Sequence, residues 1–295
     1  MVRMSSWSTL GASVRGASHE ENGKPNQDAV RLNTPCGKSN CVIISVSDGH
    51  GNARSFRSGQ GAALGAECAQ RVLRDFVRKL GPNPPFSVVR RQVQNLWPLA
   101  MIAAWKKAVR DDLAAHPFSP MDFAAFPEKP PKIKPGKDLP PAAYLAYGAT
   151  LVAVVVTPRY FIYSQLGDGD ILAVHADGRV VRPLPRQHEF MANQTESLCT
   201  QKAHRLFQVR VEPCRADSPV LVSVSTDGYA NCFRTDEGFF KVGADLLTYL
   251  RLEGIDFVEQ QLENWLRESS HDGSGDDISV GMAVRRRVAG REDQS

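Results

Sequence analysis

Short apolar runs separated by turns containing glycine, asparagine and aspartate recur along the chain, a pattern typical of β-strands. The first clear run covers residues 41–47 and is rich in β-branched side chains. The later runs follow one another closely, as strands joined by hairpin turns do. The further predicted strands lie at 146–157, 159–168, 169–177, 178–184, 206–211, 219–226 and 276–286.

Apolar positions spaced three and four residues apart predict a helix over 62–80, which ends at Gly81. A second pattern of this kind covers 89–113, and Pro98 inside it predicts a kink or a break. Both helices are expected to lie against a sheet. Two more helices are predicted at 242–252 and 255–268.

The order of these elements predicts the fold class. Strands in hairpin-like succession, with helices gathered after the first strand and near the end, favour an α+β fold over alternating βαβ units. Two antiparallel sheets stacked face to face, with helices outside, satisfy this order. We expect a single domain over residues 1–295, because the strands after the middle of the chain need partners from before it.

Three segments break the pattern. Residues 116–141 hold eight of the chain's 19 prolines and predict an extended surface insertion, with a proline-rich recognition segment as the alternative. Residues 185–204 are polar and irregular and predict a flap, with either a substrate-selecting role or no dedicated partner. Residues 285–295 predict a short basic, solvated tail.

Composition excludes several classes of protein. The chain has 295 residues, of which 42% are apolar, enough for a substantial core. No apolar run approaches the ~20 residues of a membrane-spanning helix, and the N-terminal stretch lacks a secretion signal, so we expect a cytoplasmic protein with no membrane partner. Six scattered cysteines without a CxxC pair indicate neither a disulfide framework nor a zinc module.

The charge balance argues against nucleic acid as a partner. The formal net charge is only +4, and the one dense basic cluster is the run of three arginines at 285–287. A nucleic-acid binder normally has a stronger basic footprint, with aromatic residues interleaved.

Acidic residues stand at the ends of several predicted strands. Asp48 follows the first strand and precedes Gly49, and Asp227 follows the strand near 220–224 and precedes Gly228. A single Asp-Gly pair is a common turn signal, but oxygen ligands at several strand ends are what Mg²⁺ and Mn²⁺ favour. The set therefore predicts a site for a hard cation. Its other members are Asp28, Asp168, Asp170, Asp276 and Asp277.

The ordered motifs "NQDAV", "SVSDGHGN", "YGATLVAVVV", "SQLGDGDILAV", "VSTDGYAN" and "GSGDDISV" resemble those of the metal-dependent serine/threonine protein phosphatases of type 2C, particularly the bacterial branch. The resemblance extends from about residue 11 to 284. It implies a four-layer α/β/β/α sandwich, in which two divalent cations, Mn²⁺ or Mg²⁺, occupy a cleft at one end of the two sheets.

Carried onto the matching positions, the resemblance implies a role for each acidic residue. Asp48 would bridge the two cations, and the carbonyl of Gly49 would bind one of them. Asp227 and Asp276 would bind the other. Asp28 would hold water bound to the second cation.

The resemblance also implies a general acid and a possible third, weaker cation. His50 would protonate the departing alcohol oxygen, although a histidine in a turn can also be purely structural. Asp168 matches the aspartate that helps to bind the third cation in bacterial members.

The implied reaction is hydrolysis of phosphoserine and phosphothreonine by direct attack of metal-activated water. The chain has neither a CxxxxxR loop nor a Gly-x-Ser-x-Gly elbow, so no covalent nucleophile competes with this mechanism. The implied partners are a phosphorylated protein substrate and a serine/threonine kinase acting in opposition.

The sequence departs from the family pattern at several positions. Gln27 stands where many members have a metal-binding glutamate, which leaves open a catalytically weak pseudophosphatase that binds a phosphoprotein or a kinase. Arg15 and His19 are both candidates for the residue that grips the substrate phosphate. Asn231 and Asp170 also replace residues common in the family, an aspartate and an arginine.

Overall fold

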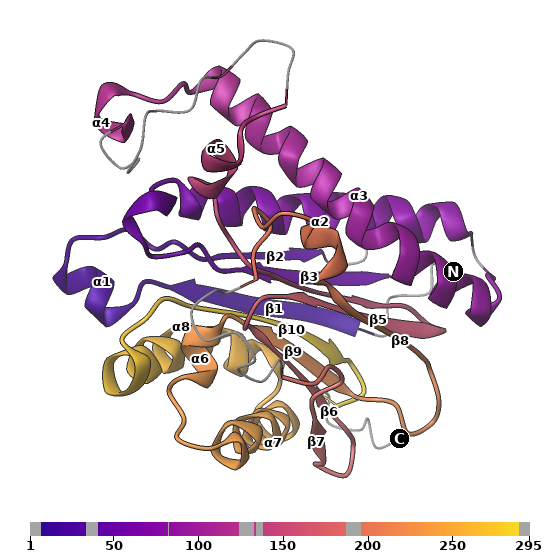
Figure 1. The fold of residues 1–295 in the computed structure, drawn as a ribbon. Helices are drawn as coiled ribbons and strands as arrows, with labels where there is room; N and C mark the ends of the chain where they lie inside the picture. Colours follow the sequence, from indigo (N-terminus) through magenta and orange to yellow (C-terminus); the bar gives the residue numbers. More distant parts are fainter. Residues whose placement is uncertain are drawn as a thin grey trace.

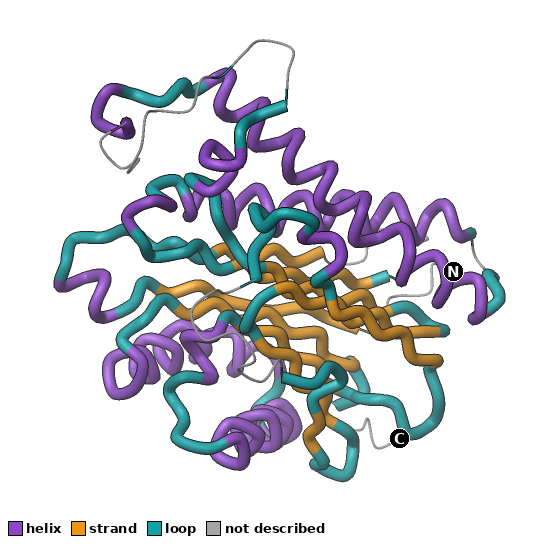
Figure 2. Tube along the Cα trace, in the orientation of Figure 1, coloured by secondary structure: helices purple, strands orange, loops and turns teal. Residues whose placement is uncertain are grey.

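Two five-stranded antiparallel sheets form the middle of the molecule, with helices on both outer faces (Figures 1 and 2). This computed structural model describes residues 7–33, 41–81, 83–123, 133, 138–186 and 196–288. The four-layer α/β/β/α sandwich expected from the sequence is confirmed.

The first sheet has the order β1-β10-β9-β6-β7, and the second has the order β2-β3-β4-β5-β8. Every neighbouring pair is antiparallel. The strands of the first sheet are β1 (Trp7–Val14), β10 (Ile278–Arg285), β9 (Leu221–Ser225), β6 (Asp170–Val174) and β7 (Val180–Val181). Those of the second are β2 (Ala29–Asn33), β3 (Val42–Ser47), β4 (Leu151–Val156), β5 (Tyr160–Leu166) and β8 (Gln208–Pro213).

The long helices cover the sheets in pairs (Figure 1). Helices α2 (Ser58–Leu80) and α3 (Phe86–Ala115) lie on the second sheet, and α7 (Asp236–Leu252) and α8 (Ile255–Ser269) lie on the first. None of the described helices is long and apolar enough to cross a membrane. The short helices are α1 (Ala17–Glu21), α4 (Pro120–Phe123), α5 (Pro141–Leu145) and α6 (Asp227–Ala230).

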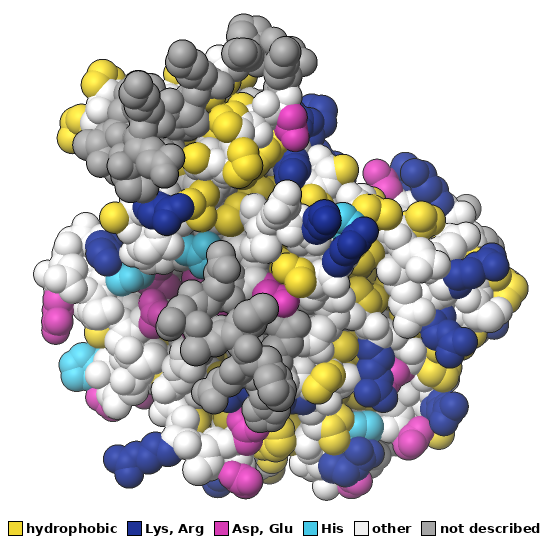
Figure 3. Space-filling model, viewed as in Figure 1, with side chains coloured by type: hydrophobic (Ala, Val, Ile, Leu, Met, Phe, Trp, Pro, Cys, Tyr) yellow, Lys and Arg dark blue, Asp and Glu magenta, His cyan; other side chains and the backbone are white. Residues whose placement is uncertain are grey.

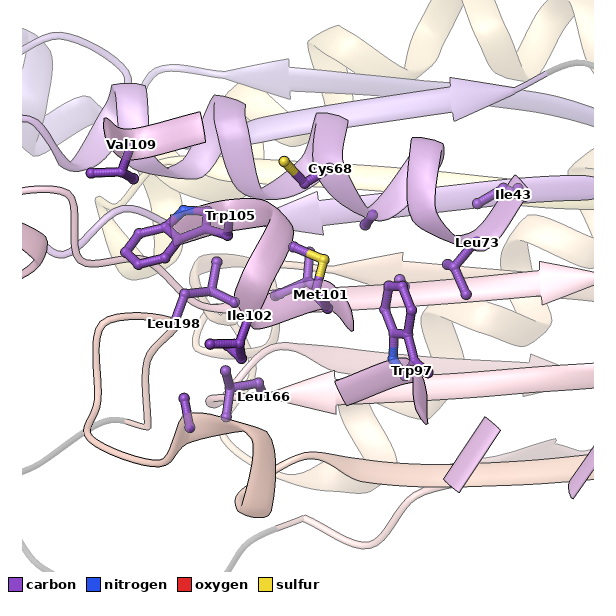
Figure 4. Close-up of a cluster of buried hydrophobic side chains, with 14 of the residues drawn as sticks. Ile43, Cys68, Leu73, Trp97, Met101, Ile102, Trp105, Val109, Leu166 and Leu198 are labelled. Atoms are coloured by element: carbon purple, nitrogen blue, oxygen red, sulfur yellow. The ribbon is translucent and has the colours of Figure 1, made fainter. Parts of the chain in front are cut away.

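The core lies in three layers, because each sheet packs against its helices and against the other sheet. Figure 4 shows the layer between α3 and the second sheet, where Trp97 and Trp105 are fully buried. Both indole N–H groups are satisfied: Trp97 donates to Ser164 Oγ at 2.7 Å, and Trp105 donates to the carbonyl of Gly61 at 3.0 Å. The first contact ties α3 to β5 of the second sheet, and the second ties α3 to α2.

Two features of the fold differ from the prediction. Strand β1 was not predicted, and α3 runs unbroken through Pro98. A proline inside a helix removes one backbone hydrogen bond. Since Trp97, Pro98 and Met101 are all buried against the sheet, packing outweighs that loss.

The predicted irregular segments are described only in part. Within 116–141, the structure describes residues 116–123, 133 and 138–141. The predicted flap at 185–204 lies outside the described residues over 187–195, and the predicted tail does so from 289 onwards. At the start of that predicted tail, Arg285 still belongs to β10.

Candidate metal centre

The strand ends that carry the predicted acidic residues meet at one end of the sandwich. In the second sheet, Ala29 pairs with Ser47, so Asp28 and Asp48 lie at the same end of two neighbouring strands. In the first sheet, β9 ends at Ser225 and β10 begins at Ile278, just after Asp276 and Asp277. The antiparallel registers therefore bring segments that are far apart in the sequence to one edge.

These strand ends line a pocket of about 360 Å³. Within it, Asp48, Asp168 and Asp227 each offer a carboxylate oxygen, and the three oxygens lie within 4.8 Å of one another. On the face shown in Figure 3, acidic and histidine side chains gather on the left of the view. The full lining is Ser18, His19, Asp48, Gly49, His50, Gly51, Asp168, Asp227, Ser274, Asp276 and Asp277.

Two hydrogen bonds between the backbone of Asp48 and Thr150 hold Asp48 in place. Its N–H donates to Thr150 Oγ1 at 3.1 Å, and its carbonyl accepts from the N–H of Thr150 at 2.8 Å. The next residue must be glycine, because a Cβ on Gly49 would lie 2.6 Å from the carbonyl oxygen of Gln27. The turn after β3 is thus fixed on both sides.

Asp168 lies in an equally constrained turn between β5 and β6. Gly167 before it has a φ of 99°, a conformation that favours glycine. The buried side chain of Gln165 donates to the carbonyls of Gly167 at 3.1 Å and Gly169 at 2.7 Å. These bonds hold the turn from the strand side and place Asp168 at the pocket.

Asp28 lies behind the pocket lining and is tied to the first sheet. Its Oδ2 accepts a hydrogen bond from Thr226 Oγ1 at 2.7 Å, and Thr226 Oγ1 in turn accepts from the N–H of Ser279 at 2.9 Å. Burial raises the pKa of Asp28 well above its usual value, and the charges of Asp277 and Asp227 add to that increase.

The pKa of Asp48 is also raised well above its usual value, first by burial and then by the charges of Asp28 and Asp227. Burial likewise raises the pKa of Asp276, which lines the same pocket outside the group of three close carboxylates. Buried carboxylates that repel one another are stabilised by a cation between them. An all-oxygen donor set of this kind fits Mg²⁺ or Mn²⁺.

His50 lines the pocket beside these carboxylates. The backbone N–H of His50 donates to the carbonyl of Gly148 at 3.1 Å. The His50 ring also lies so close to Gly148 that a Cβ on that glycine would be 2.6 Å from His50 Cδ2. Burial lowers the pKa of His50, and the charge of Asp227 opposes that decrease.

The two candidates for gripping phosphate are placed differently. His19 lines the pocket, with Nε2 3.9 Å from Asp276 Oδ1 and Nδ1 2.9 Å from Asp277 Oδ2. Arg15 is not among the lining residues, and its Nη2 donates to the carbonyl of His19 at 2.8 Å. Arg15 therefore supports α1, the short helix that carries His19.

Asp277 was grouped from the sequence with the acidic residues at strand ends but was given no individual role. Its side chain is 3% exposed and accepts the backbone N–H groups of Gly16 and Gln27, both at 2.7 Å. The sequence signal was the pair of adjacent aspartates before the last strand, but it does not show which of the two faces inward.

Comparison with protein families decides the identity of the fold. Residues 15–267 match the family model described as protein phosphatase 2C. The chain belongs to the protein phosphatase 2C family. By class it is therefore a metal-dependent protein serine/threonine phosphatase.

Solved structures of bacterial phosphatases share this fold. The S. agalactiae serine/threonine phosphatase is 16% identical, with 94% of this chain and 99% of that chain covered and a TM-score of 0.53. The catalytic domain of the phosphatase PstP in complex with 2 manganese ions is 15% identical, with coverages of 94% and 97% and a TM-score of 0.52. Stp1 from Staphylococcus aureus is 12% identical, with coverages of 96% and 95% and a TM-score of 0.54. A search of the curated proteins found no match.

The residues that depart from the phosphatase pattern have partners of their own. Gln27 Nε2 donates to Ser58 Oγ at 2.7 Å, and Asn231 Nδ2 donates to Asp227 Oδ2 at 3.0 Å. Asp170 begins β6 and accepts two hydrogen bonds from Arg182, at 2.7 and 3.0 Å. It is therefore a buried ion-pair residue of this phosphatase domain and does not line the pocket.

Proposed function

We propose that this protein is an active phosphatase that hydrolyses phosphoserine and phosphothreonine in proteins. The observation that carries the proposal is the group of three carboxylate oxygens, from Asp48, Asp168 and Asp227, within 4.8 Å of one another in a pocket. Carboxylates held this close together repel one another, so the arrangement costs stability unless a cation lies between them.

The proposed ligands follow the resemblance stated from the sequence. Two Mn²⁺ or Mg²⁺ ions would be held by Asp48, which would serve both, by the Gly49 carbonyl for one ion and by Asp227 and Asp276 for the other. Asp28 holds coordinated water, a role supported by its burial and its single hydrogen bond from a side chain. Two bound cations would lower the pKa of water and neutralise charge on the phosphoryl group. The phosphatase PstP was solved with 2 manganese ions, which supports the count.

Asp168 is proposed to help bind a third, weaker cation. The side chain of Asp168 is exposed, whereas that of Asp48 is largely buried. An ion held partly by an exposed carboxylate keeps more water and binds less tightly than one held by buried carboxylates.

His50 is proposed as the general acid. Its lowered pKa makes the imidazolium a stronger proton donor to the serine or threonine oxygen that leaves. The Gly148 carbonyl holds its backbone, so that the ring stays at the pocket. His19 is proposed to contact the substrate phosphate, because it lines the pocket and Arg15 does not.

The biological setting is also a proposal. We place the activity in the cytoplasm, on phosphorylated protein substrates, in opposition to a serine/threonine kinase. The formal net charge of +4, with its only dense basic cluster at residues 285–287, supports protein over nucleic acid as the substrate.

One observation favours the alternative, a catalytically weak binder of phosphoproteins. Gln27 directs its amide to Ser58, so the site has one carboxylate fewer than the family pattern. The weaker cation affinity that follows would lower activity without abolishing phosphoprotein binding.

A single assay separates the two functions. The protein is incubated with a chromogenic phosphate monoester and with a phosphopeptide, with and without millimolar Mn²⁺. Mn²⁺-dependent turnover that Asp48→Asn abolishes, and that the remote substitution Asp75→Asn leaves intact, supports the phosphatase. Phosphopeptide binding without turnover at any Mn²⁺ concentration supports the binder and overturns our proposal.

A further inference from the structure

One buried carboxylate of the pocket lining, that of Asp277, has no role in the proposed chemistry. Asp277 stands next to the proposed ligand Asp276, and its side chain is only 3% exposed. A carboxylate so far removed from water is retained only where several donors satisfy it.

Three groups surround this carboxylate, and all belong to the segment that leads from β1 to β2. Oδ1 accepts the N–H of Gly16 at 2.7 Å, and Oδ2 accepts the N–H of Gln27 at 2.7 Å. Oδ2 also lies 2.9 Å from Nδ1 of His19, at the distance of an ion pair but without the geometry of a hydrogen bond. Asp277 thus contacts the first residue before α1, the helix itself and the segment before β2.

The backbone around Asp277 leaves no room for adjustment. A Cβ on Gly16 would lie 2.3 Å from the carbonyl carbon of Asp276, and a Cβ on Gly228 would lie 2.2 Å from the carbonyl oxygen of Asp277. The backbone that carries the Asp277 carboxylate is therefore closely packed on both sides, beside the imidazole ring of His19.

The geometry places the negative charge of Asp277 against the Nδ1 edge of His19. The opposite edge, with Nε2, is then the edge that faces the pocket and lies 3.9 Å from Asp276 Oδ1. When a carboxylate holds one edge of an imidazole ring, the ring is already oriented. It therefore loses less conformational entropy when its other edge binds a ligand.

We infer that Asp277 is a positioning residue that orients His19 toward the substrate phosphate. The inference rests on the proposed function, because it assumes that a phosphoryl group enters the pocket. Asp277 is assigned a role that acts through His19, and not as a ligand of the substrate or the cations.

A double-mutant cycle tests whether Asp277 acts through His19. Asp277→Asn removes the charge and one of the two acceptors, and His19→Asn keeps a donor near Asp277 but removes the pocket-facing nitrogen. The readout is the inhibition constant of inorganic phosphate, measured at a Mg²⁺ concentration that saturates each variant. We expect Asp277→Asn to weaken phosphate binding about tenfold in the wild-type background, the effect of losing one charge-assisted contact. In the His19→Asn background it should weaken binding less than about twofold.

The matched control is Asp112→Asn on α3. Asp112 is a partly buried carboxylate that accepts from Tyr147 and pairs with His116 at 3.4 Å, outside the pocket. Asp112→Asn should lower the stability of the protein without changing the inhibition constant of inorganic phosphate. If Asp277→Asn has the same effect in both backgrounds, or none, Asp277 does not act through His19 and the inference is wrong.

A crystal structure of the wild-type protein with Mg²⁺ and inorganic phosphate tests the same point if Asp277→Asn does not fold. His19 Nε2 should lie within hydrogen-bond distance of a phosphate oxygen, with Nδ1 still against Asp277. A ring turned away from Asp277 overturns the inference. The proposed function fails separately, through absence of metal-dependent turnover in the wild-type protein.

Discussion

Burial sets the chemistry of the acidic residues. Burial is the largest cause of the raised pKa of both Asp28 and Asp48, and neighbouring carboxylates add to it: Asp277 and Asp227 for Asp28, and Asp28 and Asp227 for Asp48. The cation-free protein therefore carries an electrostatic cost at the pocket that bound cations remove. The residues of the proposed cation site therefore make the cation-free protein less stable.

Asp48→Asn is expected to stabilise the cation-free protein by on the order of 1–3 kcal/mol near neutral pH, because it removes a poorly compensated buried charge. The same substitution should abolish the stabilisation that Mn²⁺ gives to the wild-type protein. Urea unfolding with and without Mn²⁺ measures both. A less stable cation-free variant would show that the carboxylate is well satisfied without cations.

The sign of the pH dependence follows from the raised pKa of Asp48. The folded, cation-free protein binds the proton of the Asp48 carboxyl more tightly than the unfolded chain does, because the pKa of an aspartate in an unfolded chain is about 3.9. The wild-type protein therefore loses stability as the pH rises from about 4 through the raised value. The advantage of Asp48→Asn should be larger at pH 8 than at pH 5 in unfolding experiments performed in a chelator.

His50→Asn tests the general acid through the leaving group. A phosphopeptide releases a poor leaving group that needs a proton, whereas a nitrophenyl phosphate releases a good one. We expect kcat on the phosphopeptide to fall about 10²–10⁴-fold and kcat on the nitrophenyl ester to fall much less. Equal losses on both substrates would assign His50 a structural role in the turn.

Glycines set how closely helix α2 approaches the pocket. A Cβ on Gly61 would lie 1.9 Å from the carbonyl oxygen of Tyr147, whereas a Cβ on Gly59 would meet nothing closer than 3.4 Å. The helix and the segment that carries Gly148 are therefore in direct backbone contact, and this contact holds the His50 turn between them.

Gly61→Ala should destabilise the protein by more than about 2 kcal/mol, because backbone must move to admit the methyl group. Gly59→Ala, in the same helix, should be neutral or stabilise by up to about 1 kcal/mol, since alanine is the better helix former. Thermal unfolding of the two variants gives the comparison. A neutral Gly61→Ala would mean that α2 can shift away from the sheet at little cost.

The sequence predicted the helices and strands whose pattern of apolar and polar positions is simple. It did not predict those whose pattern is mixed. Strand β3 is mostly apolar and buried throughout, and its end at Asp48 was found. Strand β1 alternates poorly, since only Trp7, Leu10 and Val14 are buried among its serines and glycine, and it was missed. The sequence predicted a kink or a break at Pro98, and no break occurs, because periodicity does not report how strongly neighbouring tryptophans pack.

The candidate site shows the same division. Acidic residues at strand ends can be recognised locally, but which of them converge depends on strand register, a property of the whole sheet. Asp277 was included in the acidic set without an individual role, because its partners, Gly16 and Gln27, lie 261 and 250 residues away along the chain. The choice between Arg15 and His19 likewise required the turn geometry.

At the scale of the molecule, the pocket joins the two sheets. Asp48 and Asp168 leave strands of the second sheet, while Asp227 and Asp276 adjoin strands of the first. The sheets also share one apolar layer, in which Val42 and Ile44 pack with Val222 and Val224. A cation bound by ligands from both sheets therefore stabilises their contact and not one sheet alone.

Mn²⁺ is consequently expected to protect both sheets to the same extent. At a concentration 100 times the dissociation constant, binding to the folded state alone adds about 2.7 kcal/mol, which slows hydrogen exchange through global unfolding about 100-fold. Amides of β4, in the middle of the second sheet, and of β9, in the middle of the first, should slow together when exchange is followed by mass spectrometry. In Asp48→Asn neither strand should respond. Protection confined to one sheet would mean that the cation is held by that sheet alone and that the sandwich opens between its layers before it unfolds.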